Sequence, residues 1–210
     1  MNVPSPDETN RLIQQARSGC QDSLEKLLVQ YQNYLRLMAT LNLERQFQGK
    51  FSASDVVQAT CIRVQNGIRD FAGSNERELM AWLRKILASQ IASEIRRYTT
   101  QARDIQLERR LATQVDQSSA MLGGFVAGEV VAAEQETPSQ TASRRERAVI
   151  LANALQALPD EYRQVIVLRH LQGMSFTDVA KQMQRSLDSV KSTWRRAIAR
   201  LKQELDEGSS

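Results

Sequence analysis

Apolar residues recur at steps of three and four along most of this chain, which is the spacing of α-helices that bury one face. The clearest stripe consists of Leu187, Val190, Trp194, Ile198, Leu201 and Leu205. It predicts a long helix that Ser186 caps and that follows a short helix begun by Ser175 and Asp178. With the tight turn between them, at Gln184 and Arg185, the two helices form a predicted helix-turn-helix.

The face of the long helix opposite this stripe is polar and basic. At about 100° per residue it carries Arg185, Asp188, Ser189, Ser192 and Arg196, with Lys191, Thr193, Arg195 and Arg200 on its flanks. Such a face fits the major groove of DNA, and an amphipathic hairpin with a solvated basic face has the same pattern. Trp194 lies on the apolar stripe, so we expect it in the core and not against a base.

The first half of the chain shows the same period in four segments. A serine or aspartate followed three positions later by an acidic residue marks three of the helix starts, at Ser5, Asp22 and Ser52. The predicted helices span about 5–18, 22–41, 52–68 and 77–98. The third has a mixed outer face, because the exposed positions around Ile62 are amides and a carboxylate. This face is typical of a protein docking surface, although single exposed apolar residues are also ordinary.

The fourth segment predicts a helix with one apolar face and one basic face. The apolar side consists of Leu79, Leu83, Ile86, Leu87, Ile91 and Ile95. The opposite side consists of Lys85, Ser89, Ala92 and Arg96. Small and hydroxyl residues between two cations allow a phosphate backbone to approach closely, so this side is a candidate nucleic-acid surface.

Helical spacing fails between residues 113 and 143, where glycine, serine, threonine and glutamine are frequent. We therefore predict two small helical domains, 1–112 and 144–210, joined by a flexible linker. The net charges are +4 for residues 1–112, −4 for 113–139 and +4 for 140–210. Two basic domains on an acidic linker suit a polyanionic partner.

The sequence does not provide the residues of a catalytic or metal site. Cys20 and Cys61 have no partners at metal-binding spacing, and His170 is the only histidine. We expect buried free thiols, no catalytic residue, no metal, no cofactor and no enzymatic activity. No apolar run is long enough to cross a membrane, and the N-terminus MNVPSPDETN lacks the blocks of a signal peptide. We expect a cytoplasmic protein without membrane insertion.

Three stretches resemble one known family. ALQALPDEYRQVIVLRHLQGMSFTDVAKQMQRSLDSVKSTWRRAIARLKQEL is similar to the C-terminal promoter-binding domain of bacterial sigma-70 factors, with its Leu-Pro-x-x-x-Arg opening and its Val-Lys-Ser before an Arg-Ala pair. SASDVVQATCIRVQNGIRDFAG and LMAWLRKILASQIASEIRRY resemble the N-terminal domain of the same family. Two domains with little else resemble the extracytoplasmic-function (ECF) group.

This resemblance implies core RNA polymerase as a partner, through the coiled coil of its largest subunit and the flap of its second-largest subunit. The segment Asp55, Val56, Val57 and Gln58 matches the Asp-Leu-Val-Gln motif that docks on the coiled coil, and Ile62 shares its face. Many family members are held inactive by an anti-sigma protein, and the sequence identifies none for this chain.

The resemblance also implies two contacts with promoter DNA. Those at the minus-ten element would come from Asp70, Phe71, Ser74, Asn75, Lys85, Ser89, Arg96 and Arg97. Those at the minus-thirty-five element would come from Arg185, Ser189, Lys191, Ser192, Arg195 and Arg196. Two positions depart from the family pattern: Gln184 occupies the usual turn glycine, and Thr193 stands where arginine is frequent.

We therefore predict a sigma factor that binds core polymerase and directs promoter recognition, DNA melting and transcription initiation. The alternative is a helix-turn-helix DNA-binding regulator that forms no holoenzyme. Such a regulator does not need the docking face around Ile62. It also does not need the loop from Asp70 to Glu76, which in the family captures a flipped base of one DNA strand.

Overall fold

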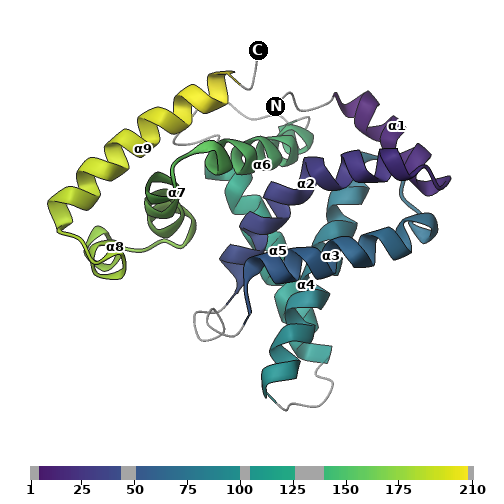
Figure 1. The fold of residues 1–210 in the computed structure, drawn as a ribbon, viewed down its shortest axis with the longest axis horizontal. Coiled ribbons are helices and arrows are strands. Elements are labelled where there is room, and N and C mark those ends of the chain that lie inside the picture. The colour runs from purple at the N-terminus through teal and green to yellow at the C-terminus, as the bar shows by residue number, and fades with distance from the viewer. Residues whose placement is uncertain (1–4, 44–50, 100–104, 126–139, 208–210) are drawn as a thin grey trace. The chain divides into compact units, whose positions relative to one another are not determined.

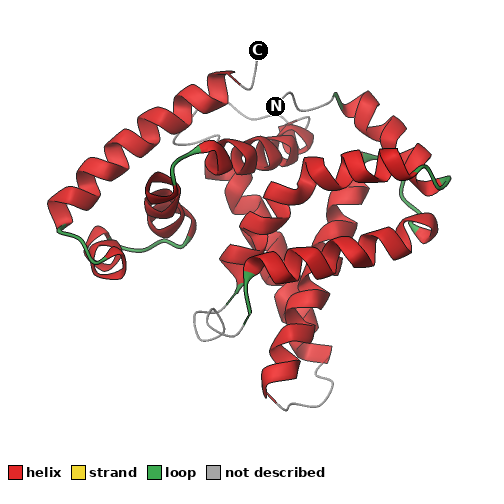
Figure 2. Ribbon diagram, viewed as in Figure 1, coloured by secondary structure: helices red, strands yellow, loops and turns green. Residues whose placement is uncertain are grey.

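The computed structural model describes residues 5–43, 51–99, 105–125 and 140–207, and the regular structure in these ranges is entirely helical (Figures 1 and 2). This confirms the predicted all-α fold class. The chain separates into two compact units, Val3–Ser119 and Ala120–Ser210, here called the N-terminal and C-terminal units. The boundary falls within a helix, at the beginning of the segment that was expected to be a flexible linker.

The N-terminal unit is built around one long helix. Its elements are α1 (Pro6–Arg17), α2 (Gln21–Asn42), α3 (Ala53–Gly67), the 3₁₀-helical turn η2 (Ile68–Asp70), α4 (Glu76–Thr99) and most of α5 (Ile105–Phe125). The helices α1, α3 and α4 all pack against α2 (Figure 1). The side chains of α2 that form the centre of the core include Tyr31, Tyr34, Leu35 and Met38.

Local capping interactions fix two of the three predicted helix starts. The hydroxyl of Ser5 accepts a hydrogen bond from the backbone N–H of Glu8. Ser52 and Asp55 form a complete capping box at the start of α3. The prediction for α2 was wrong by one residue, because the helix begins at Gln21 with no side-chain cap. These starts are predictable since each depends only on neighbouring residues.

The helix α4 buries a broader face than its apolar residues predicted. Leu79, Leu83, Leu87 and Ile91 are buried as expected. Ala92 was expected on the polar side, and it is fully buried instead. Alanine is small and only weakly apolar, so its position in the pattern says little about which face it will occupy.

The predicted flexible linker was wrong for residues 113–125, which belong to the helix α5. Leu111 and Val115 of α5 are fully buried at a four-residue spacing. The residues that follow are polar, and three of them bind the helices α2 and α4. Residues 126–139 of the expected linker lie outside the described residues, and residues 140–143 belong to the next helix.

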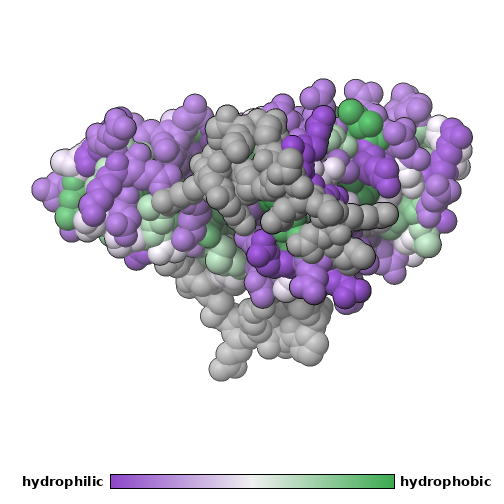
Figure 3. Space-filling view, turned by 90° about the horizontal axis from the view of Figure 1, so that it is seen from below, coloured by the Kyte–Doolittle hydropathy of each residue, from purple (hydrophilic) through white to green (hydrophobic). Residues whose placement is uncertain are grey.

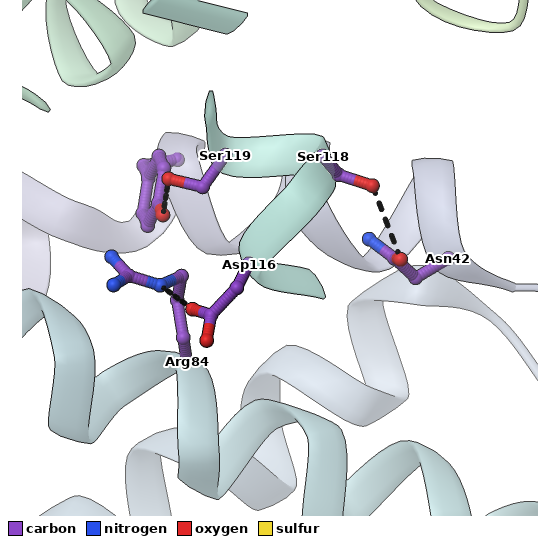
Figure 4. A network of polar contacts seen from close by, with 6 residues as sticks. Asn42, Arg84, Asp116, Ser118 and Ser119 are labelled. Carbon is purple, nitrogen blue, oxygen red and sulfur yellow. Dashed lines mark hydrogen bonds and ion pairs between the residues drawn. The ribbon is translucent and has the colours of Figure 1, made fainter. Parts of the chain in front are cut away.

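A polar network attaches α5 to the rest of the N-terminal unit (Figure 4). Arg84 of α4 is 8% exposed, and its Nε donates to Asp116 Oδ1 at 2.5 Å. Tyr34 and Ser119 share a hydrogen bond of 2.9 Å between their hydroxyls, and Ser118 Oγ donates to Asn42 Oδ1 at 3.2 Å.

Burial and these contacts shift the pKa values of Tyr34 and Arg84. Burial raises the pKa of the Tyr34 hydroxyl above its ordinary value. Burial opposes the charge of Arg84, but the neighbouring oxygens of Tyr34 and Asp116 outweigh it and raise the pKa of the guanidinium. Arg84 therefore stays charged inside the unit, and Asp116 is the carboxylate that compensates it.

Replacing Asp116 by alanine is expected to destabilise the N-terminal unit by about 1–3 kcal/mol, because Arg84 would keep its charge without a carboxylate. Asp116→Asn retains an acceptor oxygen and should lose less. Chemical denaturation followed by Trp82 fluorescence, in a Trp194→Phe background, measures this unit alone. Gln117→Ala on the exposed side of α5 is the control. Equal stability of Asp116→Ala and Gln117→Ala would contradict the prediction.

The C-terminal unit has a long final helix to which the other helices attach. Its elements are α6 (Gln140–Ala157), α7 (Asp160–Ile166), the π-helical turn η4 (Val167–Leu171), α8 (Phe176–Met183) and α9 (Leu187–Glu207). The helices α6, α7 and α8 each pack against α9 (Figure 1). As predicted, Ser175 caps α8 by accepting from the N–H of Asp178, and Ser186 accepts from the N–H of Ser189 at the start of α9.

The turn between α8 and α9 takes the conformation that a glycine would take. Gln184 has φ 54° and ψ 45°. Among the residues that the structure describes, it is the one non-glycine residue with a positive φ. Its N–H donates to Lys181 O, and the N–H of Arg185 donates to Ala180 O. The same pair of hydrogen bonds ends α1 at a glycine: the N–H of Gly19 donates to Ala16 O, and the N–H of Cys20 donates to Gln15 O. Glutamine thus forms the helix-ending turn for which glycine is suited.

Gln184→Gly is expected to stabilise the C-terminal unit by about 1 kcal/mol, because glycine adopts a left-handed conformation without strain between Cβ and the carbonyl. Denaturation followed by Trp194 fluorescence, in a Trp82→Phe background, measures this unit. Lys181→Gly, inside α8 and exposed, serves as the control and should lose about 1 kcal/mol. A loss in both variants would show that the turn is not strained.

Candidate nucleic-acid interface

The exposed side of α9 carries the cations expected to meet DNA. Lys191, Arg195 and Arg196 are exposed, whereas Ser189 and Ser192 are half-buried beside them. Within the described ranges, none of the three cations has an ion-pair partner. Three charges without a carboxylate neighbour can each bind a phosphate without first breaking an ion pair.

The buried side of α9 differs from the predicted stripe. Thr193 and Ala197 are buried together with Val190 and Leu201, at steps of three and four. Leu187 was expected to be buried, and it is 39% exposed at the first position of the helix. Thr193 was expected on the DNA-facing flank, and it packs inward because its hydroxyl donates to Glu161 at 3.1 Å.

An aromatic cluster supports α9 from behind. Trp194 is half-buried, and its Nε1–H donates to His170 Nε2 at 2.7 Å. The ring of Phe176 lies edge-on to the indole with centroids 5.4 Å apart. Since its N–H is already bound and its ring is packed, Trp194 acts as support for the helix and not as a surface for a base.

The predicted docking face on α3 is present in part. Asp55, Gln58 and Gln65 are exposed, and Ile62 is 52% exposed between them. Val56 and Val57, also predicted to contact a partner, are 0% and 3% exposed and therefore lie in the core of the unit. A continuous run of four residues cannot point one way on a helix, so the middle pair of this motif belongs to the core.

Asp55 has a structural role besides any binding role. Its Oδ2 accepts hydrogen bonds from the backbone N–H of Ser52 at 2.9 Å and from the Ser52 hydroxyl at 2.8 Å. These two bonds lower the pKa of Asp55 below its ordinary value, with the backbone N–H the larger cause. The carboxylate is thereby held ionised at the start of α3.

The loop between η2 and α4 is held in one shape by contacts from three sides. Arg17 Nη1 donates to Gly73 O at 3.0 Å, the N–H of Ser74 donates to Glu78 Oε2 at 2.8 Å, and Asn75 Oδ1 accepts from the N–H of Glu78 at 3.0 Å. A Cβ at Gly73 would lie 2.2 Å from the ring of Phe71, so no other residue fits there without displacing that ring. Asp70 and Ser74 are exposed.

Phe71 was expected to contact DNA, and in this structure its side chain packs inward. Its side chain is 7% exposed, and its ring stacks on Trp82 with centroids 4.9 Å apart. Phe71 is apolar and follows directly after a helix, so burying it is favourable. It forms the inner wall against which the loop packs.

The predicted basic side of α4 is partly covered by acidic residues. Lys85 is exposed and Ser89 is half-buried. Arg96 lies 4.0 Å from Glu108 of α5, and Arg97 Nη1 donates to Glu94 at 3.0 Å. Each pair keeps one partner largely exposed to solvent, which weakens it, so a stronger anion such as phosphate can compete for the two arginines.

Comparison with known proteins finds relatives that cover most of the chain. Residues 148–201 match the protein family described as Sigma-70, region 4. The RNA polymerase sigma factor YlaC of Bacillus subtilis is 26% identical over 188 residues, which are 88% of this chain and 92% of that protein. The ECF RNA polymerase sigma-E factor of Haemophilus influenzae is 25% identical over 181 residues, 86% of each chain.

Residues 148–201 thus contain a sigma-70 region 4, and the chain is similar to ECF sigma factors over most of its length.

A shorter match is closer in sequence. The RNA polymerase sigma-E factor of Streptomyces coelicolor is 40% identical to this chain over 72 residues, 33% of this chain and 40% of that one. Among solved structures, CnrH in complex with the cytosolic domain of CnrY is 23% identical in sequence. The match covers 94% of this chain and 97% of that chain, with a TM-score of 0.31.

Two carboxylates with structural roles were not predicted from the sequence. Asp116 lies in the segment expected to be flexible, and the signal that could have found it is the spacing of Leu107, Leu111 and Val115 just before it. Glu161, in the first turn of α7, binds two residues of the helix-turn-helix that are distant in sequence. No local pattern predicts such a contact.

The described part of the chain contains no group of three or more His, Cys, Asp or Glu side chains arranged to hold a metal ion. Cys61 is half-buried and Cys20 is exposed, so the expectation of two buried thiols was wrong for Cys20. Burial raises the pKa of the Cys61 thiol. A search of the described helices finds none with the length and apolar character needed to cross a membrane.

Proposed function

We propose that this sigma factor attaches to core RNA polymerase through α3 and reads promoter DNA through two further surfaces. The observation that carries the proposal is the outer face of α3, where Ile62 is 52% exposed between Gln58 and Gln65. Covering this isoleucine with a partner would remove apolar area from water and so favour binding. The coloured part of the face drawn in Figure 3 is mostly hydrophilic, with smaller hydrophobic areas.

The N-terminal unit is proposed to hold the minus-ten element. Its candidate contacts are the exposed loop residues Asp70 and Ser74 and the side of α4 with Lys85, Arg96 and Arg97. Extruding a base from a duplex costs a few kcal/mol. A loop fixed by Arg17 and Glu78 would bind the extruded base without a further cost of ordering.

The C-terminal unit is proposed to anchor the minus-thirty-five element in a major groove through α9. When one polymerase holds both units, the second DNA contact becomes intramolecular, and its effective concentration rises. Two weak contacts can then hold a melted promoter that neither holds alone. The polymerase makes the RNA, so no catalytic step is assigned to this chain. Its proposed place of action is the cytoplasm, and an anti-sigma partner stays a prediction from family resemblance.

The direct test is transcription by core polymerase, with and without the purified sigma factor, on genomic templates. Initiation at discrete sites that requires this protein supports the proposal. Binding to duplex DNA without formation of a holoenzyme would instead indicate the helix-turn-helix regulator.

Ile62→Ser is expected to weaken binding to core polymerase about tenfold, because it removes apolar area that docking would bury. Gln58→Ala should act in the same direction. Anisotropy of a labelled sigma factor titrated with core polymerase measures the affinity. Val29→Ser is a matched control, since Val29 is a 57% exposed apolar residue on α2. Equal losses for Ile62→Ser and Val29→Ser would contradict docking through α3. Asp55 is a less suitable position for this test, because replacing its side chain would also break the capping box of α3.

Arg196→Ala is expected to reduce transcription from promoters that depend on the upstream element about 10- to 100-fold, through loss of a base or phosphate contact. Initiation rates of the reconstituted holoenzyme, on templates with intact or scrambled upstream elements, measure the effect. Lys202→Ala is the control, because Lys202 is exposed near the far end of the same helix. If Arg196→Ala lowered initiation equally on both kinds of template, Arg196 would not read the element.

A further inference from the structure

One carboxylate oxygen joins three parts of the helix-turn-helix. Glu161 Oε1, on α7, accepts a hydrogen bond from Arg185 Nη1 at 2.6 Å and another from Thr193 Oγ1 at 3.1 Å. Arg185 lies in the turn before α9, and Thr193 lies two turns into α9 with 1% of its surface exposed. The carboxylate thus holds the beginning of α9 at two points.

Arg185 is fixed at its backbone and at its side chain. Its N–H donates to Ala180 O at 3.0 Å within the turn, and its guanidinium binds Glu161. The side chain is still 45% exposed, so the remaining N–H groups of the guanidinium can reach a ligand. Arg185 directly precedes Ser186, the cap of α9, the helix whose residues Ser189, Ser192 and Arg196 form the face proposed to read DNA.

We propose that Glu161 is a positioning residue for promoter recognition, which holds Arg185 in a single orientation toward the upstream element. This inference rests on the proposed function of α9. An unrestrained arginine would bind any nearby phosphate, whatever the sequence. Paired with Glu161, the guanidinium is partly neutralised and pre-oriented, so its binding depends more on a matching acceptor than on bulk phosphate charge. Glu161 therefore increases the preference for specific over non-specific DNA.

The expected effect of Glu161→Gln follows from this geometry. The amide oxygen can still accept from Thr193, so α9 keeps its support, while Arg185 is released as a full positive charge. Affinity for non-specific duplex should rise, and the ratio of specific to non-specific affinity should fall about tenfold. The slope of log affinity against log salt should steepen by about one, because one more phosphate is neutralised.

The experiment uses the full-length chain in its holoenzyme with core polymerase. The probes are a duplex carrying the upstream element of a promoter that the wild-type holoenzyme transcribes, and a shuffled duplex of the same composition. Asp160→Asn is the matched control, since it removes a neighbouring charge on the same helix from a 95% exposed side chain. Its ratio of affinities should stay unchanged.

A double-mutant cycle separates positioning from simple support. Glu161→Gln should have no effect on the ratio in an Arg185→Ala background. The inference is overturned if Glu161→Gln keeps the wild-type ratio, or if it lowers the ratio equally with and without Arg185. A wild-type holoenzyme that initiates nowhere would overturn the proposed function itself, which is a different result.

Discussion

Both units depend on the same constraint: a polar group that enters the core must find a partner there. In the N-terminal unit the buried guanidinium of Arg84 requires Asp116, and this requirement ties α5 to α4. In the C-terminal unit the buried hydroxyl of Thr193 requires Glu161, and the indole N–H of Trp194 requires His170. Apolar packing brings these helices together, and the polar pairs select one rotation and one register among those that apolar contacts alone would tolerate.

The sequence predicted what local interactions determine. Helix starts at Ser5, Ser52 and Ser175 were found because each cap is made with a residue three positions away. The turn at Gln184 was found for a similar reason, although its left-handed backbone could not be read from a glutamine. The all-α class follows from the same short-range spacing.

Contacts between distant residues limited the rest of the prediction. The helix α5 was missed because its polar end is stabilised by Tyr34 and Asn42, which lie far away in sequence. The buried face of α9 was predicted from apolar residues alone, so it included Leu187 and left out Thr193. Residue matches to a family motif also do not separate surface from core, as the buried Val56 and Val57 show.

The attachment of α5 has a practical consequence for dividing the protein. A fragment cut after residue 112, where the sequence pattern suggests that the first domain ends, would lack Asp116, Ser118 and Ser119. It would leave Arg84, Tyr34 and Asn42 facing solvent without their partners. A self-sufficient N-terminal fragment must therefore extend at least through Ser119.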